Sequence, residues 1–110
     1  MAKNQNIIIG TGEMFGKGVY ANRSFKKGEI VIQYNLKKLS HAEFENLSEE
    51  EQYFVHTHHG VKYLYSTPER YVNHSPNPNT IQDLKGRCDV AIRDIKKGEQ
   101  ITTDASKDDV

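Results

Sequence analysis

Residues 70–79 read Arg70-Tyr71-Val72-Asn73-His74-Ser75-Pro76-Asn77-Pro78-Asn79. Two prolines and three asparagines within these ten positions oppose a helix and would make a poor strand. The segment is therefore predicted to be a fixed, turn-rich loop that exposes backbone groups and side-chain amides. Such a loop can bind a small ligand through hydrogen bonds, but its composition alone favours a purely structural loop.

Outward from this loop, the segment at residues 23–31 recurs at residues 93–101. The first copy reads Arg-Ser-Phe-Lys-Lys-Gly-Glu-Ile-Val and the second reads Arg-Asp-Ile-Lys-Lys-Gly-Glu-Gln-Ile. Each copy predicts a strand, a turn whose glycine can adopt positive φ, and a returning strand. The copies are either two independent hairpin turns or a pseudo-duplicated β-structure whose halves frame a central site.

Elsewhere the chain combines short β-like runs with a single helical stretch. The predicted strands lie near residues 7–9, 19–21, 30–34, 61–65, 90–92 and 101–103. Two capping-box patterns, beginning at Ser40 and Ser48, predict two short helices within about residues 41–57. The apolar positions expected to be buried there are Phe44, Leu47, Tyr53 and Phe54. We expect one domain over residues 1–110, with a polar tail at 106–110.

Charge and cysteine content exclude several classes of protein. Fifteen Lys and Arg balance fifteen Asp and Glu, so no global field would steer the chain to nucleic acid or to an anionic membrane. The single Cys88 excludes an intramolecular disulfide and a Cys-rich zinc site, and it is expected to be a buried or edge thiol. The chain has no apolar run of transmembrane or signal-peptide length, so we expect an intracellular protein in a reducing compartment such as the cytoplasm.

The amino-acid sequence of residues 70–79 resembles the Arg-Phe-Ile-Asn-His-Ser-Cys-x-Pro-Asn signature of the SET-domain protein-lysine methyltransferases. Three further landmarks occur in the family's order. Residues 16–21 look like its early Gly-x-Gly segment, residues 25–34 like the strand that follows, and residues 94–104 like its closing Gly-Glu-Glu-Ile-Thr-x-Asp motif. The resemblance covers about residues 7–106, which is nearly the whole chain.

The resemblance implies a mainly β, SET-type β-clip fold of small sheets, with a short helical insert at about 41–57 and a C-terminal pseudoknot. It also implies that S-adenosylmethionine binds on one face, that the substrate lysine of a protein enters from the other, and that a narrow channel joins them. The zinc-binding cysteines that flank larger members are missing, so the chain resembles a minimal SET domain and no metal is expected.

The cofactor-binding residues implied by the resemblance are Gly16, Lys17, Gly18, Arg70, Asn73 and His74. The glycines would let the backbone approach the methionine end of the cofactor, and Asn73 with His74 would hold it through backbone bonds and the Asn amide. Tyr34 aligns with a tyrosine that lines the lysine channel. Simpler interpretations stay open: Lys17 as a solvated side chain, Arg70 as an anchor of its loop, and Tyr34 as a core tyrosine.

The sequence departs from the family at Ala105, where the closing motif has its most important catalytic tyrosine. Alanine offers neither a hydroxyl nor a channel wall, whether it is natural or a deliberate replacement. The expected function is methyl transfer from S-adenosylmethionine to a protein lysine, impaired at this position. The alternatives are a cofactor- or peptide-binding module on the same fold, and a relative that shares only the β-clip architecture, as sugar-binding or ice-binding proteins do.

The histidine run at residues 56–59 has a metal-binding and a structural interpretation. Without cysteines or paired carboxylates at a set spacing, the run is expected to end the helix, where positive charge suits the helix dipole. Similarly, Glu49-Glu50-Glu51 is expected to be a solvated helix N-terminus rather than a catalytic carboxylate pair.

Overall fold

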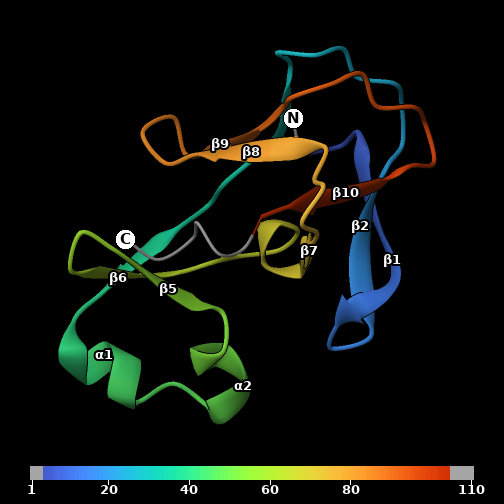
Figure 1. The fold of residues 1–110 in the computed structure, drawn as a ribbon. Helices are drawn as coiled ribbons and strands as arrows, with labels where there is room; N and C mark the ends of the chain where they lie inside the picture. Colours follow the sequence, from blue (N-terminus) through green and yellow to red (C-terminus); the bar gives the residue numbers. More distant parts are fainter. Residues whose placement is uncertain (1–3, 105–110) are drawn as a thin grey trace.

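The structure is a computed structural model that describes residues 4–104. Its strands form three small sheets, with two short helices beside the third sheet (Figure 1). The first sheet has the order β1-β2-β10-β7, with bounds Ile7–Met14, Lys17–Ala21, Gln100–Thr103 and Asn73–His74. The second has the order β3-β9-β8, with bounds Ile30–Gln33, Cys88–Ala91 and Thr80–Asp83. The third has the order β4-β6-β5, with bounds Lys37–Leu39, Val61–Leu64 and Val55–His58.

Strand β10 lies between β2 and β7 and joins the end of the chain to the loop at residues 70–79. It pairs antiparallel with β2 and parallel with β7, where Thr102 lies opposite Asn73 and Thr103 opposite His74. The backbone N–H of Ser75 also donates to the carbonyl of Thr103 at 2.9 Å. The C-terminal strand thus packs on this loop at Thr102 and Thr103, as the expected pseudoknot requires.

The repeated segments pair with each other. Phe25 and Ile95 exchange two backbone hydrogen bonds, each 2.8 Å long, across the antiparallel bridge that joins the copies. The turn glycines Gly28 and Gly98 have φ of 93° and 90°. Each donates at 2.8 Å to the other half, Gly28 to Ala91 and Gly98 to Ala21. The repeat is therefore a pseudo-duplicated β-structure rather than two independent turns.

The helical stretch is shorter than predicted. Helix α1 spans His41–Glu45 and begins with a complete capping box at Ser40, and α2 spans Glu49–Gln52 with Ser48 as its N-cap. Phe54 is buried at 1% exposure, and Phe44 and Leu47 are half-buried. The prediction was wrong for Tyr53, which is 62% exposed and packs edge-on against the likewise exposed Phe15 ring.

The prediction that residues 56–59 end a helix was also wrong. His56 and His58 lie on strand β5, which pairs with β6 in a hairpin. The turn residues His59 and Gly60 both have positive φ, 51° and 80°, which suits a two-residue turn between twisted antiparallel strands. Hydrogen bonding to β6 stabilises the extended conformation of these residues more than their weak helical preference stabilises a helix.

Strand β1 also extends beyond the predicted residues 7–9, reaching Met14 through an irregularity in its pairing with β2 between Thr11 and Met14. Gly10 keeps a regular pairing opposite Gly18, and Gly12 lies within the shift in register between Thr11 and Met14.

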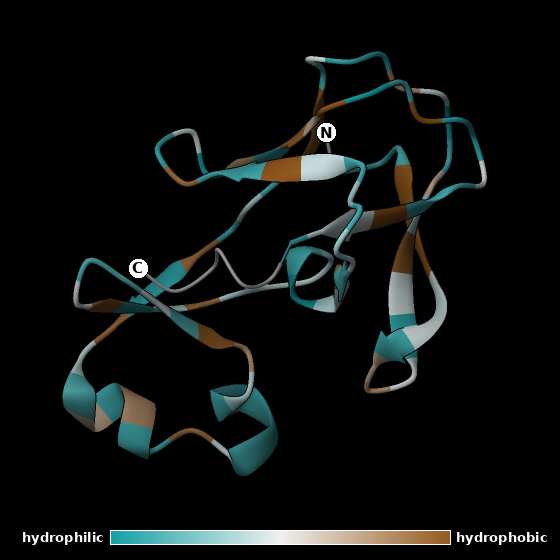
Figure 2. Ribbon diagram, in the orientation of Figure 1, coloured by the Kyte–Doolittle hydropathy of each residue, from teal (hydrophilic) through white to brown (hydrophobic). Residues whose placement is uncertain are grey.

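Apolar residues from the first two sheets, together with Tyr34, Tyr65 and Val72, form one core. In Figure 2 the brown, hydrophobic segments gather on the strands, whereas α1 and α2 are mostly teal. Among residues 4–104, no helix has the length and apolar character needed to span a membrane.

Candidate functional site

A cleft of about 260 Å³ opens where β1, β7 and β10 meet. The residues that line it are mostly of polar type and include Gly12, Glu13, Asn73, His74 and Thr102. Two of the predicted cofactor-binding residues, Asn73 and His74, thus share this cleft. Hydrogen-bonding groups and a carboxylate at Glu13 suit a ligand that carries hydroxyl, amine and cationic groups.

The side chain of Asn73 is 5% exposed and is bonded within the protein. Its Oδ1 accepts from the backbone N–H of Glu13 at 2.7 Å. Its Nδ2 donates to the carbonyls of Lys17 and Tyr71, each at 2.9 Å. Because both amide hydrogens are used internally, this side chain joins the β1–β2 hairpin to β7, a role that the sequence analysis did not foresee.

The Gly-x-Gly segment forms the turn of the β1–β2 hairpin and the start of β2. Gly16 has φ of 78° with open space around it, so its role in this structure is to make the turn. A Cβ on Gly18 would lie 2.8 Å from Nε2 of Gln100, so the close approach there is to β10. Lys17 lies with its Nζ 4.8 Å from the centre of the Tyr71 ring.

A second, smaller cavity of about 60 Å³ is lined by aromatic side chains, among them Tyr34, His56 and Tyr65. The Tyr34 and Tyr65 rings are 5.4 Å apart between centroids, and His56 meets Tyr65 edge-on at 4.6 Å. Tyr34 is buried, and its hydroxyl donates to Oδ1 of Asp89. Tyr34 therefore both belongs to the core and lines this aromatic cavity.

Two buried carboxylates also line the aromatic cavity: Asp89, 1% exposed, and Glu69, 5% exposed. Oε2 of Glu69 accepts from the backbone N–H groups of Asn35 at 2.6 Å and Ser66 at 3.3 Å. Its Oε1 is buried without a hydrogen-bond partner among residues 4–104. Burial raises the pKa of Glu69, against the lowering effect of these backbone donors and of Arg70.

The sequence analysis missed Asp89, Glu69, Tyr65 and His56 as members of this cavity. One sequence signal could have indicated Asp89: it is a charged residue inside the otherwise apolar strand β9. Ionised side chains are seldom fully buried without a partner, so such a residue points to a polar site.

Arg70 anchors its loop to the helical insert. Its guanidinium makes two bonds to the Glu51 carboxylate, of 3.2 and 2.8 Å, and its Nε donates to the carbonyl of Tyr65 at 2.9 Å. The guanidinium also lies 4.4 Å from the centre of the Phe54 ring. These contacts fit the interpretation of Arg70 as an anchor of its loop. The hydrogen bond from Arg70 is also the main cause of the lowered pKa of the Glu51 carboxylate.

At the end of β10, Nδ1 of His74 lies 3.7 Å from Oδ1 of Asp104. The side chain of His74 is 49% exposed, so it borders the polar cleft from the solvent side. Ala105, the position that departs from the family motif, lies outside the described residues.

The polar cleft and the aromatic cavity are lined by neighbouring residues of the same three segments. Glu13, Asn73 and Thr102 line the cleft, whereas their chain neighbours Met14, Val72 and Thr103 line the cavity. The two openings therefore adjoin, with these segments between them.

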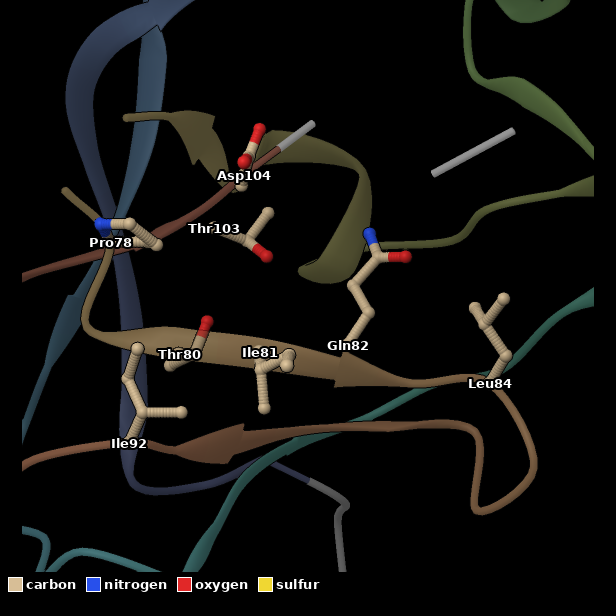
Figure 3. Close-up of a pocket in the computed structure, with 8 residues that line it drawn as sticks. All are labelled: Pro78, Thr80, Ile81, Gln82, Leu84, Ile92, Thr103 and Asp104. Carbon is tan, nitrogen blue, oxygen red and sulfur yellow. The ribbon is translucent and has the colours of Figure 1, made fainter. Parts of the chain in front are cut away.

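A third pocket, of about 160 Å³, adjoins the aromatic cavity. Gln82 of β8 and Thr103 of β10 line both, and Figure 3 shows these two side chains on the same side of β8, with Ile81 on the opposite side. Ile81 and Ile92, which make the pocket apolar, are partly exposed. The pocket lacks carboxylates other than Asp104 and holds none of the predicted site residues.

Cys88 is buried, and burial is the main cause of its raised pKa, which is the opposite of what a nucleophilic thiolate requires. Within residues 4–104, no three His, Cys, Asp or Glu side chains are grouped so as to hold a metal ion.

Comparison with known proteins identifies the family. A family model described as SET domain matches residues 16–104. The Variant-silencing SET domain-containing protein of Plasmodium falciparum (isolate 3D7) is 30% identical over 119 aligned positions, which cover 89% of this chain. The chain spans only 5% of the length of that relative.

Three solved structures have a similar fold. One is a Plasmodium falciparum protein provisionally named a histone methyltransferase, with a TM-score of 0.70 and 20% identity over 94% of both chains. A humanized mutant of the Chaetomium thermophilum Polycomb Repressive Complex 2, bound to an inhibitor, has a TM-score of 0.72 and 25% identity over 93% of this chain and 15% of that one. The third, ctPRC2 in an autoinhibited conformation bound to S-adenosylmethionine, has a TM-score of 0.73 and 24% identity over 98% of this chain and 16% of that one. The mainly β fold of small sheets is thereby confirmed, and the chain belongs to the SET domain family.

Proposed function

We propose that this chain binds S-adenosylmethionine in the polar cleft and transfers its methyl group to a lysine side chain that enters the aromatic cavity. The observation that carries the proposal is that neighbouring residues at 13–14, 72–73 and 102–103 line the cleft and the cavity, so that the two openings adjoin. In-line transfer requires the donor methyl carbon and the lysine nitrogen to approach to about 3–3.5 Å, and the proposal puts that meeting point between the two adjoining openings.

The residues of the polar cleft fit the cofactor chemically. Gly12 lets the backbone pass close to β2, since a Cβ there would lie 2.5 Å from the carbonyl oxygen of Lys17. Glu13, His74 and Ser75 offer groups that can bind hydroxyls and an amine. When bound, the cofactor supplies an electrophilic methyl group on a sulfonium cation. Gly16 and Gly18 shape the hairpin that borders the cleft, and Asn73 fixes that hairpin to β7.

The aromatic cavity would act on the lysine by positioning and by its low polarity. Free lysine has a pKa of about 10.4, so its ammonium group must lose a proton before nitrogen can attack. A nearby sulfonium cation disfavours the charged ammonium by charge repulsion. The Tyr34 hydroxyl, which donates to Asp89, has an oxygen that can accept from an amine N–H and so orient the nitrogen.

Membership of the family does not by itself predict fast methyl transfer, because the rate depends on the residue at position 105. In an aligned family member a tyrosine hydroxyl would stand there, and alanine cannot replace it. We therefore propose that the chain binds the cofactor with ordinary affinity and transfers methyl groups slowly.

The proposal is tested by titrating S-adenosylmethionine calorimetrically and measuring single-turnover methyl transfer to lysine-containing peptides. Ala105→Tyr is expected to raise the transfer rate by about 10²–10⁴ with little change in cofactor affinity. Ala105→Phe is the matched control, since it restores a ring without a hydroxyl. Failure of the parent chain to bind S-adenosylmethionine would exclude both the methyltransferase and a cofactor-binding module, and would favour a protein that shares only the fold.

A second candidate is a binding module that holds a lysine-bearing peptide without modifying it. The missing hydroxyl at Ala105 and the two carboxylates of the aromatic cavity favour it. Peptide binding without transfer in both the parent and Ala105→Tyr would support this candidate over the enzyme.

A further inference from the structure

A pocket of about 360 Å³ lies between the β5–β6 and β8–β9 hairpins, whose turns are on the same side of the molecule in Figure 1. Half of the residues that line it are apolar, with Leu36 and Leu84 among them. The other half are of basic type: His58, His59, Lys85 and Arg87. No Asp or Glu is among the described residues that line this space, which we call the basic pocket.

Lys85 and Arg87 bring two positive charges to the basic pocket that the protein does not neutralise. Both side chains are exposed, and neither forms an ion pair within residues 4–104. The acidic residue of the same turn, Asp83, accepts instead from the backbone N–H of Gly86 at 2.9 Å. The guanidinium carbon of Arg87 lies 5.7 Å from the centre of the Tyr63 ring, which also lines the pocket. An anion with apolar atoms beside its charge would complement both features of this pocket.

The turn that carries these cations is fixed to a wall of the aromatic cavity. Arg87 has φ of 54°, a left-handed conformation that is uncommon for residues other than glycine. Its carbonyl accepts from the backbone N–H of Tyr34 at 2.8 Å. Since Tyr34 lines the aromatic cavity, one hydrogen bond joins the β8–β9 turn to that cavity.

The β5–β6 hairpin makes a second connection between the two openings. His58 lines the basic pocket, and its Nε2 lies 2.7 Å from the hydroxyl of Tyr65, which lines the aromatic cavity. His56, two residues earlier on β5, lines the cavity itself. Alternate residues of a strand point to the same face and lie about 7 Å apart along it. The two openings are therefore separated by about two residues of extended chain.

We infer that the basic pocket binds the carboxylate of a Glu or Asp side chain two positions away from the lysine that enters the aromatic cavity. The inference rests on the proposed function for the occupant of that cavity. It names the substrate class, a protein segment in which an acidic residue flanks the target lysine.

The charge of the pocket also selects against other segments. Lys85 and Arg87 attract a carboxylate, whereas they repel a Lys or Arg at the same position of the substrate. The apolar residues, such as Leu36 and Leu84, offer contacts to the methylene groups of the acidic side chain. A uniformly basic segment is therefore a poorer ligand than one that combines a lysine with a nearby carboxylate.

The experiment titrates the full chain with short Gly-Ser peptides that carry a central lysine, following amide shifts by NMR at about 50 mM salt. Two positions before the lysine, or two positions after it, each peptide carries either Glu or Gln, which is of similar size but uncharged. In one of these placements the Glu peptide is expected to bind about three- to tenfold more tightly, since two solvent-screened ion pairs contribute modestly. The preference should shrink at about 500 mM salt.

Variants of the two cations test their role. Lys85→Gln and Arg87→Gln should each reduce the preference about two- to threefold, and the double variant should abolish it. Lys96→Gln is the matched control, since it removes an exposed lysine from the turn of the second repeat, outside the pocket, and should keep the full preference. Lys85→Glu combined with Arg87→Glu should reverse the preference, so that a peptide with Lys in place of Glu binds more tightly.

Equal binding of the Glu and Gln peptides by the parent in both placements overturns the inference, and this comparison decides even if a variant fails to fold. An unchanged preference in the folded double Gln variant overturns it too. Cofactor titration keeps the two proposals apart. A chain that binds S-adenosylmethionine and methylates Glu and Gln peptides with equal kcat/KM refutes the basic pocket alone, whereas one that prefers a Glu peptide but binds no cofactor refutes the methyltransferase alone.

Discussion

The amide oxygen of Asn73 accepts a hydrogen bond from the backbone N–H of Glu13 at 2.7 Å, across 60 positions of sequence. With the bond from Nδ2 to the carbonyl of Lys17, it fixes both strands of the β1–β2 hairpin to β7. The residue that the family signature assigns to the cofactor thus also builds the wall of the polar cleft.

Replacing Asn73 by alanine should therefore lower stability as well as cofactor affinity. The change removes three hydrogen bonds of a buried side chain, and we expect a loss of about 2–3 kcal/mol in the free energy of unfolding. Urea denaturation measures this loss. Asn77→Ala, an exposed position in the same loop, is the control and should change stability little. Wild-type stability in Asn73→Ala would mean that these bonds contribute nothing net.

The pair formed by Arg70 and Glu51 should couple the helical insert to the aromatic cavity. Because the Glu51 side chain is 40% exposed, solvent screens the pair, and a double-mutant cycle with Arg70→Lys and Glu51→Gln should give a coupling of about 0.5–1 kcal/mol. Lysine cannot make the two-pronged contact. A coupling of zero, measured by denaturation of the four proteins, would show that the contact does not anchor the loop.

The raised pKa of Glu69 predicts a pH dependence of stability. Since the native state keeps this proton above the ordinary value of 4.5, it binds more protons than the unfolded chain between 4.5 and the raised pKa. The stability due to this group is present at low pH and is lost as the pH rises through that window. Glu69→Gln, which cannot ionise, should therefore gain stability relative to the parent between about pH 4 and pH 8.

Denaturation of the parent and Glu69→Gln at both pH values checks the sign. Glu50→Gln, which alters an exposed side chain, should follow the parent at both. A parent that instead becomes more stable relative to Glu69→Gln as the pH rises would show that the carboxylate is stabilised, not penalised, by its surroundings.

Strand β10 should be required for folding because it is an inner strand of the first sheet. Ile101 is fully buried, and Ile101→Ala is expected to cost about 2–5 kcal/mol. A chain that ends at residue 100 should lose its cooperative thermal transition, whereas one that ends at residue 104 keeps all of β10 and serves as the control. Cooperative melting of the shorter chain would contradict the central place of this strand.

The sequence by itself determined the family, the order of its motifs and most of the strands. The segment at 70–79, the glycine turns and the paired repeats are local patterns, and local backbone preferences suffice to interpret them. Alternating apolar residues at 61–65 predicted β6 in the same way. The short strands β4, β5, β7 and β8 were missed, because their residues are extended mainly by pairing with distant partners.

Only the tertiary structure decided what each side chain of the site contacts. Asn73 meets Glu13, Tyr34 meets Asp89, and Arg70 meets Glu51, and each pair joins segments that are far apart in the sequence. Nothing in the residues around Glu69 indicates that its Oε1 is buried beside aromatic rings, since burial is set by how the sheets close on one another. Local preferences fix which segments extend or turn, whereas the charge and shape of the cavity arise from long-range packing.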